Sequence, residues 1–322
     1  MASPESSPRS HAGFSAETLA AAGFPPISYD TLVVGESFRS DERLIRPQDV
    51  EAYAYAVDDH DPWFFEPGPW GGPIAHPTLL ANQALFLRHN RYVVPAGLHT
   101  RMVFDFVGSI PLGTRARTTG QVLDKYVRRD KPYMVTGYET AAEDGRVLVR
   151  GHFVQMLFRA ETAPPAGSGP RPEPEPPAVD PAVRSAPGRS GTLGVGQRLG
   201  PVARTLEQRQ IDIYSGVKPG SIHTDESWAR AKGFPTTIAQ GMMSTAYVSA
   251  LMTAALGAGF VEGGRMDVRF LRPVLRGDRL VVSGEVVGFE RDGGQLRAHL
   301  EVAVHNQDGA QTLGGTASGL VP

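Results

Sequence analysis

Side chains that can transfer protons stand in two loops of this sequence. The segment DHDPWF contains Asp59, and the segment GSIHTDESW contains His223 and Asp225. Histidine and carboxylate side chains are the common general acids and bases of enzymes. Each of the three also has a structural alternative, because aspartate is frequent in turns and at helix N-caps, and a loop histidine can bond to the backbone.

Other kinds of chemistry are excluded by what the sequence lacks. It has no cysteine, which excludes disulfides, thiolate nucleophiles and zinc–thiolate sites. It shows no glycine-rich phosphate loop, no metal-binding constellation and no Ser/His/Asp nucleophile elbow. We therefore expect neither a metal nor a cofactor.

Composition indicates a globular protein of about two domains. The chain has 322 residues, 41% of them hydrophobic, with a net charge of −2. This charge gives no electrostatic reason to bind nucleic acid or an anionic membrane. Its most apolar stretch, residues 241–260, contains Ser, Thr and three Gly, and predicts a buried helix rather than a membrane span. Without a signal-peptide pattern, we expect a cytoplasmic protein, and the excess of Arg over Lys is typical of a GC-rich bacterial genome.

The sequence contains an internal duplication. Its halves match at a constant offset of 164 residues over about seventy positions without a gap, which indicates two copies of one structural unit. The matched pairs include Ile74 with Ile238, His76 with Gln240, Met102 with Met266, Phe106 with Phe270, Gly113 with Gly277 and Gly120 with Gly284.

Four segments follow from the duplication. Residues 1–28 are a Ser/Pro/Ala-rich lead that we expect to be disordered, with one short helix at Ser15 to Ala22. Residues 29–159 and 193–322 are the two repeats. Residues 160–192 form a proline-rich linker with almost no bulky apolar side chains, which predicts an extended connection.

Each repeat has the same predicted order of elements. An amphipathic helix (Pro47 to Val57; Glu207 to Tyr214) precedes a long apolar helix (Thr78 to His89; Gly241 to Leu256). In the second half, strand patterns follow at Met266 to Leu271, Arg279 to Glu290 and Gln295 to Asn306. A helix that is apolar on nearly all faces must be enclosed. The sequence therefore predicts an α+β double hotdog, in which an antiparallel sheet wraps each long helix and continues from one half into the other.

The second half resembles the MaoC-like, (R)-specific enoyl-thioester hydratases and dehydratases. That family has a loop of the form Asp-x-Asn-Pro-x-His-x-Asp, followed by Ala, Gly-Phe and Ile-Ala-His-Gly at the start of the central helix. This sequence has GSIHTDESWARAKGFPTTIAQGMM, and the later VRFLRPVLRGDRLVVSGEV is also similar to the family. Together with DHDPWF and PIAHP in the first half, the resemblance covers residues 30–158 and 193–320.

The resemblance implies a site for an acyl thioester carried by coenzyme A or an acyl-carrier protein. In the family, an Asp and a His five residues apart hold the water that adds to the β-carbon. Here Asp59 is followed five residues later by Phe64, and His223 is preceded five residues earlier by Lys218, or is matched to Val217 if the loop has an insertion. Neither half keeps the pair.

We therefore expect the working site in the second half, with His223 central and Asp225 or Asp59 as candidate carboxylate partners. The candidate substrate-binding residues are Lys218, Tyr214, Gln240, Gly241 and Met242. The backbone N–H groups of Gly241 and Met242 would meet the thioester oxygen, while Tyr214 has the core as its alternative.

A second hypothesis stays open, namely a repurposed hotdog protein that acts as a biosynthetic cyclase or isomerase or only binds its ligand. The assembly is expected to be a monomeric double hotdog or a homodimer.

Overall fold

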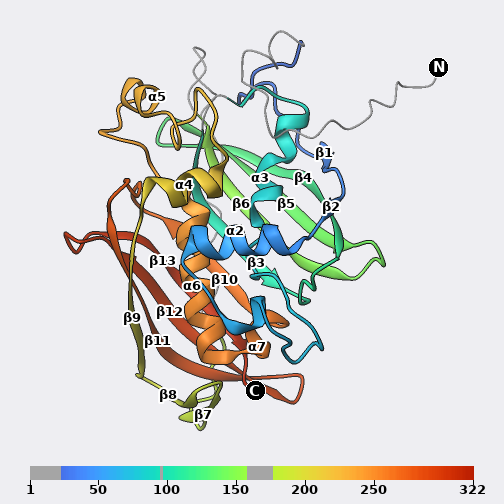
Figure 1. Ribbon diagram of the computed structural model, residues 1–322, viewed down its shortest axis with the longest axis vertical. Helices are drawn as coiled ribbons and strands as arrows, with labels where there is room; N and C mark the ends of the chain where they lie inside the picture. Colours follow the sequence, from blue (N-terminus) through green and yellow to red (C-terminus); the bar gives the residue numbers. More distant parts are fainter. Residues whose placement is uncertain (1–22, 95–96, 158–176) are drawn as a thin grey trace.

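The computed structural model describes residues 23–94, 97–157 and 177–322. Within these ranges the chain forms one large curved antiparallel sheet with helices against one of its faces (Figure 1). No helix in these ranges is long and apolar enough to cross a membrane.

The helical segments of the first half are short except for α2. They are α2 (Pro47–Val57), the 3-10 turns η1 (Pro62–Phe64) and η2 (Leu87–Asn90), and α3 (Ala81–Phe86). Those of the second half are α4 (Gln208–Ser215), α5 (Glu226–Ala231), α6 (Gly241–Leu256) and α7 (Ala258–Val261).

In the part of the chain that the structure describes, six strands belong to the first half and seven to the second. The first six are β1 (Ser37–Arg39), β2 (Arg43–Leu44), β3 (Gly97–Phe106), β4 (Arg115–Arg128), β5 (Lys131–Ala142) and β6 (Val147–Leu157). The others are β7 (Ser185–Gly188), β8 (Gly191–Gly194), β9 (Arg198–Thr205), β10 (Arg265–Phe270), β11 (Arg279–Asp292), β12 (Gln295–His305) and β13 (Gln311–Leu320).

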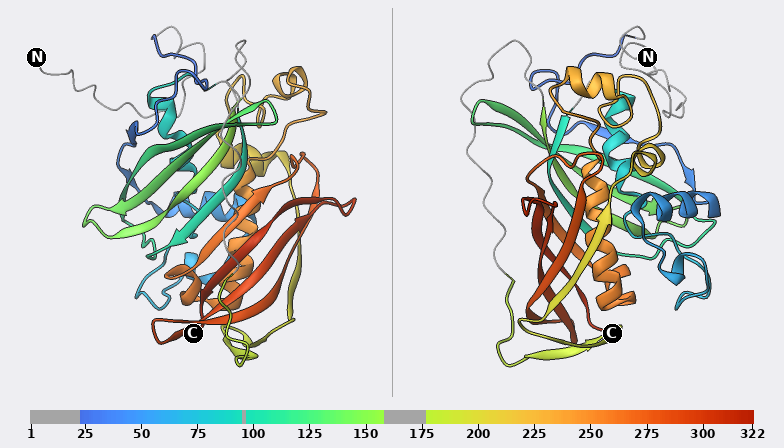
Figure 2. Two further views of the ribbon diagram at one scale, coloured as in Figure 1. Left: turned by 180° about the vertical axis from the view of Figure 1, so that it is seen from behind. Right: turned by 60° about the vertical axis from the view of Figure 1, so that its left-hand side comes forward.

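The two halves share one sheet. Its eleven strands run in the order β1-β4-β5-β6-β3-β10-β13-β12-β11-β9, with β2 paired to β4. Strands β3 and β10 form the boundary between the halves, and Figure 2 shows the first-half strands continuing into the second-half strands across it. The predicted continuous sheet is confirmed.

The boundary between β3 and β10 has an internal two-fold pseudosymmetry. Met102 pairs with Val268, and Phe104 pairs with Met266. Shifting either pair by the 164-residue offset exchanges it for the other, so the pseudo-axis passes through the pair Val103 and Asp267. This is the isologous contact of a two-fold dimer, formed inside one chain. The Arg101 guanidinium binds both carboxylate oxygens of Asp267 across it.

Two equivalent glycines let neighbouring strands approach this boundary. A Cβ on Gly151 would lie 2.0 Å from the carbonyl oxygen of Val103, and a Cβ on Gly315 would lie 2.0 Å from that of Asp267. Both glycines and both carbonyls are related by the same offset of 164. The duplication therefore preserved a steric requirement of the sheet.

The central helices differ between the halves. Helix α6 matches its predicted bounds and buries most of its side chains. It runs along the second-half sheet (Figure 2). The predicted first-half helix, Thr78 to His89, is wrong in length, because only α3 and the η2 turn form there. The Thr78 N–H donates to the His76 ring, and the next residues make i to i−3 turns instead of α-helical bonds.

The predicted linker and lead lie partly outside the described residues. Residues 158–176 and 1–22 are outside them, including the predicted helix Ser15 to Ala22. Strands β7 and β8 form a small ribbon whose Ala186 and Leu193 are buried. The prediction of an extended linker is therefore corrected for residues 185–192, because these two side chains bury apolar surface against the second half.

Candidate functional site

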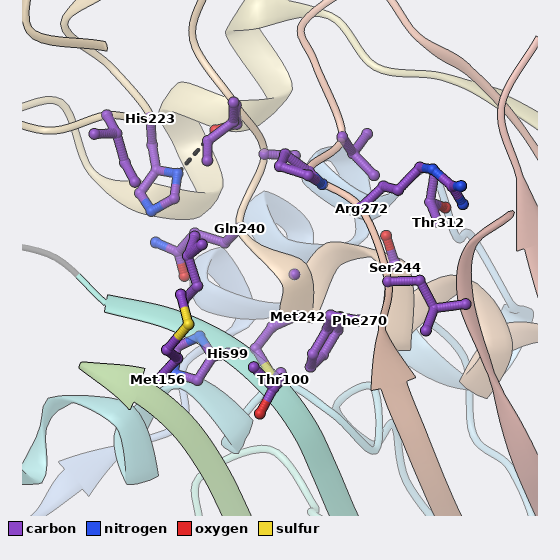
Figure 3. Close-up of a pocket in the computed structure, with 18 of the residues that line it drawn as sticks. His99, Thr100, Met156, His223, Gln240, Met242, Ser244, Phe270, Arg272 and Thr312 are labelled. Carbon is purple, nitrogen blue, oxygen red and sulfur yellow. Dashed lines mark hydrogen bonds between the residues drawn. The ribbon is translucent and has the colours of Figure 1, made fainter. Parts of the chain in front are cut away.

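A cavity of about 280 Å³ lies at the N-terminal end of α6. The second half contributes His223, Gln240, Gly241, Met242 and Phe270 to its walls, among others (Figure 3). The first half contributes Leu85 from α3, Leu98, His99 and Thr100 from β3, and Met156 from β6. The cavity is thus closed by both repeats.

Backbone contacts hold the loop that carries His223. The Ile238 N–H donates to the Ile222 oxygen at 3.1 Å, and the Ala239 N–H donates to the Val274 oxygen at 2.9 Å. From α4, the Gln208 amide donates to the His223 oxygen at 3.0 Å. The loop of His223 is therefore held on both sides of this residue.

The hydrogen bonding of His223 leaves one ring nitrogen for the cavity. Its Nδ1 lies 2.8 Å from the Ile238 carbonyl oxygen, and since a carbonyl can only accept, Nδ1 carries the proton. Burial lowers the pKa of His223 to about 4, and the positive charge of Lys218 acts in the same direction, against the bond to Ile238. At neutral pH the imidazole is uncharged, with the Nε2 lone pair available as a base.

The start of α6 provides hydrogen-bond donors beside this base. The first N–H groups of an α-helix have no acceptor within the helix, and Gln240, the N-cap residue, makes no side-chain capping bond. The N–H groups of Gly241 and Met242 are in this position. A Cβ on Gly241 would lie 2.9 Å from the Phe270 ring, so glycine keeps the helix head close to the cavity wall.

The structure gives Asp225 and Lys218 places outside the cavity wall. The Asp225 carboxylate is the N-cap of α5 and accepts bonds from Trp228 N–H at 3.0 Å, Gly220 N–H at 3.1 Å and Ser227 Oγ at 2.6 Å. The bonds from Ser227, Trp228 and Gly220 lower its pKa to about 2. Lys218 lies on the exposed loop, where its backbone bonds to Thr224. Within the described ranges, no carboxylate forms an ion pair with His223.

Asp59 is paired instead with a histidine of its own half. Its Oδ2 lies 3.2 Å from Nε2 of His76, at the first-half helix head. Burial, the largest single effect, raises the pKa of Asp59. The interaction with His76 and its charge outweigh burial, so the pKa of Asp59 lies below its ordinary value. Phe64 packs against the His76 ring with centroids 5.4 Å apart. The pair was not predicted from the sequence, because no motif links the positions of Asp59 and His76.

Tyr214 lies in the contact between α4 and α2, away from the cavity. Its ring is 5.4 Å from that of Tyr53. Burial raises its pKa well above the ordinary value. This position matches the core alternative for Tyr214. Gln240, Gly241 and Met242 do line the cavity.

The first-half cavity residues were not found from the sequence. Leu85, His99 and Met156 stand far from the motif in the chain, and only the pairing of β3 with β10 brings them to α6. A weak signal existed for Phe270 and Arg272, which belong to the family-like segment VRFLRPVLRGD. Among the described residues, no group of three His, Asp or Glu side chains is arranged to hold a metal ion.

Comparison with known proteins indicates the family of the second half. Residues 194–307 match the family model of the MaoC like domain. The second half of the chain is a MaoC-like domain. An (R)-specific enoyl-CoA hydratase from Rhodospirillum rubrum is 29% identical over 93 residues, which are 27% of this chain and 62% of that enzyme. The match with the MaoC-like domain supports the hydratase and dehydratase class.

Solved structures resemble the whole chain, beyond the MaoC-like domain. A MaoC-like dehydratase is similar with a TM-score of 0.69 and 17% identity, over 91% of this chain and 99% of that one. A MaoC domain dehydratase from Chloroflexus aurantiacus reaches 0.72 with 15% identity, over 92% and 98%. A double hotdog protein from Mycobacterium tuberculosis reaches 0.64 with 15% identity, over 92% and 98%. At these identities the likeness concerns the fold, and it confirms the double hotdog.

Proposed function

We propose that this protein interconverts a 2-enoyl thioester and a 3-hydroxyacyl thioester by adding or removing water, in the cavity at the head of α6. The observation that carries the proposal is the free Nε2 of a neutral His223 in a cavity that also contains the start of a helix. The carrier is coenzyme A or an acyl-carrier protein, and the name of the Rhodospirillum relative favours the former.

One base is sufficient for the proposed hydration. Nε2 of His223 takes a proton from water as the water oxygen bonds to the β-carbon. The electrons of the carbon–carbon double bond move to the thioester oxygen, which becomes an enolate. The same Nε2 then gives its proton to the α-carbon on the same face, so water is added syn. Dehydration is the reverse.

The head of α6 stabilises the charge that develops in this step. The N–H groups of Gly241 and Met242 point toward the cavity end of the helix, where the helix dipole favours negative charge. Removing one donor from a developing oxyanion typically raises the reaction barrier by about 2.7–4 kcal/mol. The combination of base and donors distinguishes this end from the first-half helix head.

A second candidate follows from the missing carboxylate. A single base can also move a proton from the γ-carbon to the α-carbon of an enoyl thioester, which shifts the double bond without water. The absence of an ion pair at His223 among the described residues favours this isomerisation over a two-group hydration. The products separate the two reactions, because hydration raises the mass by one water and isomerisation leaves it unchanged.

The test is turnover of purified protein with 2-enoyl thioesters of several lengths, followed by mass analysis of the products. We expect hydration in the wild type and a fall of about 10²–10⁴ in kcat for His223→Ala. Circular dichroism checks that this variant folds. Unchanged turnover in His223→Ala would exclude the mechanism.

Asp59→Asn is the matched control at the family's aspartate position. It removes the charge beside His76 but does not touch the cavity. We expect its kcat to stay within about threefold of the wild type, since such a change is under 1 kcal/mol in the barrier. Equal, large losses in both variants would point to one composite site.

A further inference from the structure

An arginine is fully buried behind the first-half wall of the cavity. Arg88 in η2 is 1% exposed. Its guanidinium donates to the side-chain oxygen of Gln155 and to the Leu85 carbonyl at 3.3 Å, and it lies 5.3 Å from the centre of the Phe153 ring. Its Nε has no hydrogen-bond acceptor among the described residues.

No counter-charge accompanies this cation. Burial lowers the pKa of Arg88 to about 9, so it remains protonated at neutral pH, and no carboxylate of the described residues forms an ion pair with it. A buried charge without a partner is strongly unfavourable. The second half has an apolar residue at the corresponding position, because an offset of 164 places the fully buried Met252 there. The fold itself therefore does not require an arginine at position 88.

Arg88 is linked to the cavity through His99 and Gln155. These two residues are Cα partners on β3 and β6. His99 lines the cavity, and so does Leu85, whose carbonyl accepts from Arg88. The Nε2 atom of His99 is enclosed and has no hydrogen-bond partner among the described residues. The first-half wall of the cavity thus contains an unpaired nitrogen, with an uncompensated positive charge behind it.

We propose that the acyl group of the substrate ends in a carboxylate, which is bound at this first-half wall by His99 with the charge of Arg88 behind it. This inference rests on the proposed function for the reacting end and adds the chemistry of the far end. A carboxylate oxygen would accept from Nε2 of His99 in the tautomer that carries the proton there. It would also supply the negative charge that Arg88 lacks.

The cavity volume limits the length of such a substrate. A volume of about 280 Å³ is below the usual range of roughly 300–1,000 Å³ for ligand sites. The site therefore fits a short acyl group, with the thioester at α6 and the carboxylate at His99.

Binding of saturated thioesters tests the carboxylate without turnover. Butyryl-CoA and succinyl-CoA have the same length and differ by a terminal methyl or carboxylate, and pentanoyl-CoA and glutaryl-CoA form a second pair. We expect the carboxylate member of at least one pair to bind at least about tenfold more tightly to the full-length protein in calorimetry, because charge-assisted hydrogen bonds are the stronger ones. Equal affinities in both pairs, or tighter binding of the methyl members, would overturn the proposal.

Arg88→Met is the decisive variant, since it restores the residue type of the second half. We expect the carboxylate preference to disappear while the melting temperature stays the same or rises, as is common when a buried charge is replaced by a hydrophobic residue. Arg150→Met is the control, because Arg150 is an exposed arginine on the same strand as Gln155. It should keep the preference. A second variant, His99→Phe, should also lose the preference for carboxylate thioesters. It keeps the proposal testable if Arg88→Met fails to fold.

The outcomes separate this proposal from the function it rests on. Preferential binding of the carboxylate thioesters without any hydration would support the wall site and reject the hydratase. Hydration of methyl-ended enoyl thioesters without any carboxylate preference would support the hydratase and reject the wall site.

Discussion

Hydrogen bonding gives the histidines of the two halves opposite roles. At His76, Nδ1 accepts from the Thr78 N–H at 3.1 Å, so Nε2 carries the proton, and it lies 3.2 Å from Oδ2 of Asp59. At His223, Nδ1 donates to Ile238 and Nε2 faces the cavity as an acceptor. Both ring nitrogens of His76 thus face protein groups, whereas Nε2 of His223 is available to a ligand. Both histidines nevertheless stand beside the head of a central helix.

The pKa of His223 predicts the pH dependence of activity. Since burial, together with Lys218, lowers this pKa to about 4, the neutral base persists well below the ordinary histidine pKa of about 6.5. We expect kcat/KM to be level down to about pH 5 and to fall as pH drops through about 4, because protonation removes the Nε2 lone pair. A profile of kcat/KM over the pH range in which the protein stays folded checks this.

Lys218→Gln provides the control for that profile. Removing the positive charge removes one cause that lowers the pKa of His223, so the acid limb should move to higher pH. The plateau rate should change little, because Lys218 does not line the cavity. An acid limb near pH 6.5 in the wild type would show that His223 is solvated or is not the base.

At the scale of elements, the hydrophobic pattern predicted those helices whose bounds depend on the burial of apolar side chains. Helices α2 and α6 have their predicted bounds, because their apolar residues are buried at helical spacing in α2 and on most faces in α6. The first-half central helix was predicted too long, because the bonds of Thr78 to His76 are not visible in a pattern of apolar residues. Strand β13 was not predicted, since its glycines give it a weak strand pattern.

The glycines of β13 lead to a stability prediction. Gly315→Ala would place a Cβ 2.0 Å from the Asp267 carbonyl oxygen, a backbone atom that cannot move aside. We expect a loss of about 3 kcal/mol or more in the free energy of unfolding, as for severe overpacking. Urea denaturation measures it.

Gly314→Ala is its matched control. The Cβ there meets the end of the Gln311 side chain, which can rotate away. Its cost should be under about 1 kcal/mol. Equal stability of the two variants would contradict the close approach of β13 to β10 at Gly315.

At the scale of the whole molecule, the fold could be predicted from the duplication, and the site only in part. A constant offset of 164 residues implies a two-fold arrangement, and the paired β3 and β10 realise it. His223 and the head of α6 were found because they lie within one motif. His99 and Arg88 were not, since their relation to the cavity depends on contacts between distant strands.

The shared sheet predicts that the halves fold together. Separated fragments 23–157 and 177–322 would each expose an edge strand, β3 or β10, with apolar residues such as Met102 and Met266 that the intact chain buries. We expect each fragment alone to be aggregated or poorly folded, and the co-expressed pair to elute as one complex in size-exclusion chromatography. Two stable, independent fragments would contradict the shared core.

The pseudo-two-fold boundary has a genetic consequence. In a homodimer of one repeat, a single codon change appears in both subunits, so an arginine that benefits one wall would also enter the core of the other helix. In this chain the two positions, Arg88 and Met252, are separate codons. The two positions can therefore differ, and here one is an arginine and the other a methionine. Fusion thus permits a substitution in one wall of the cavity that a homodimer of identical repeats would have to place in both subunits.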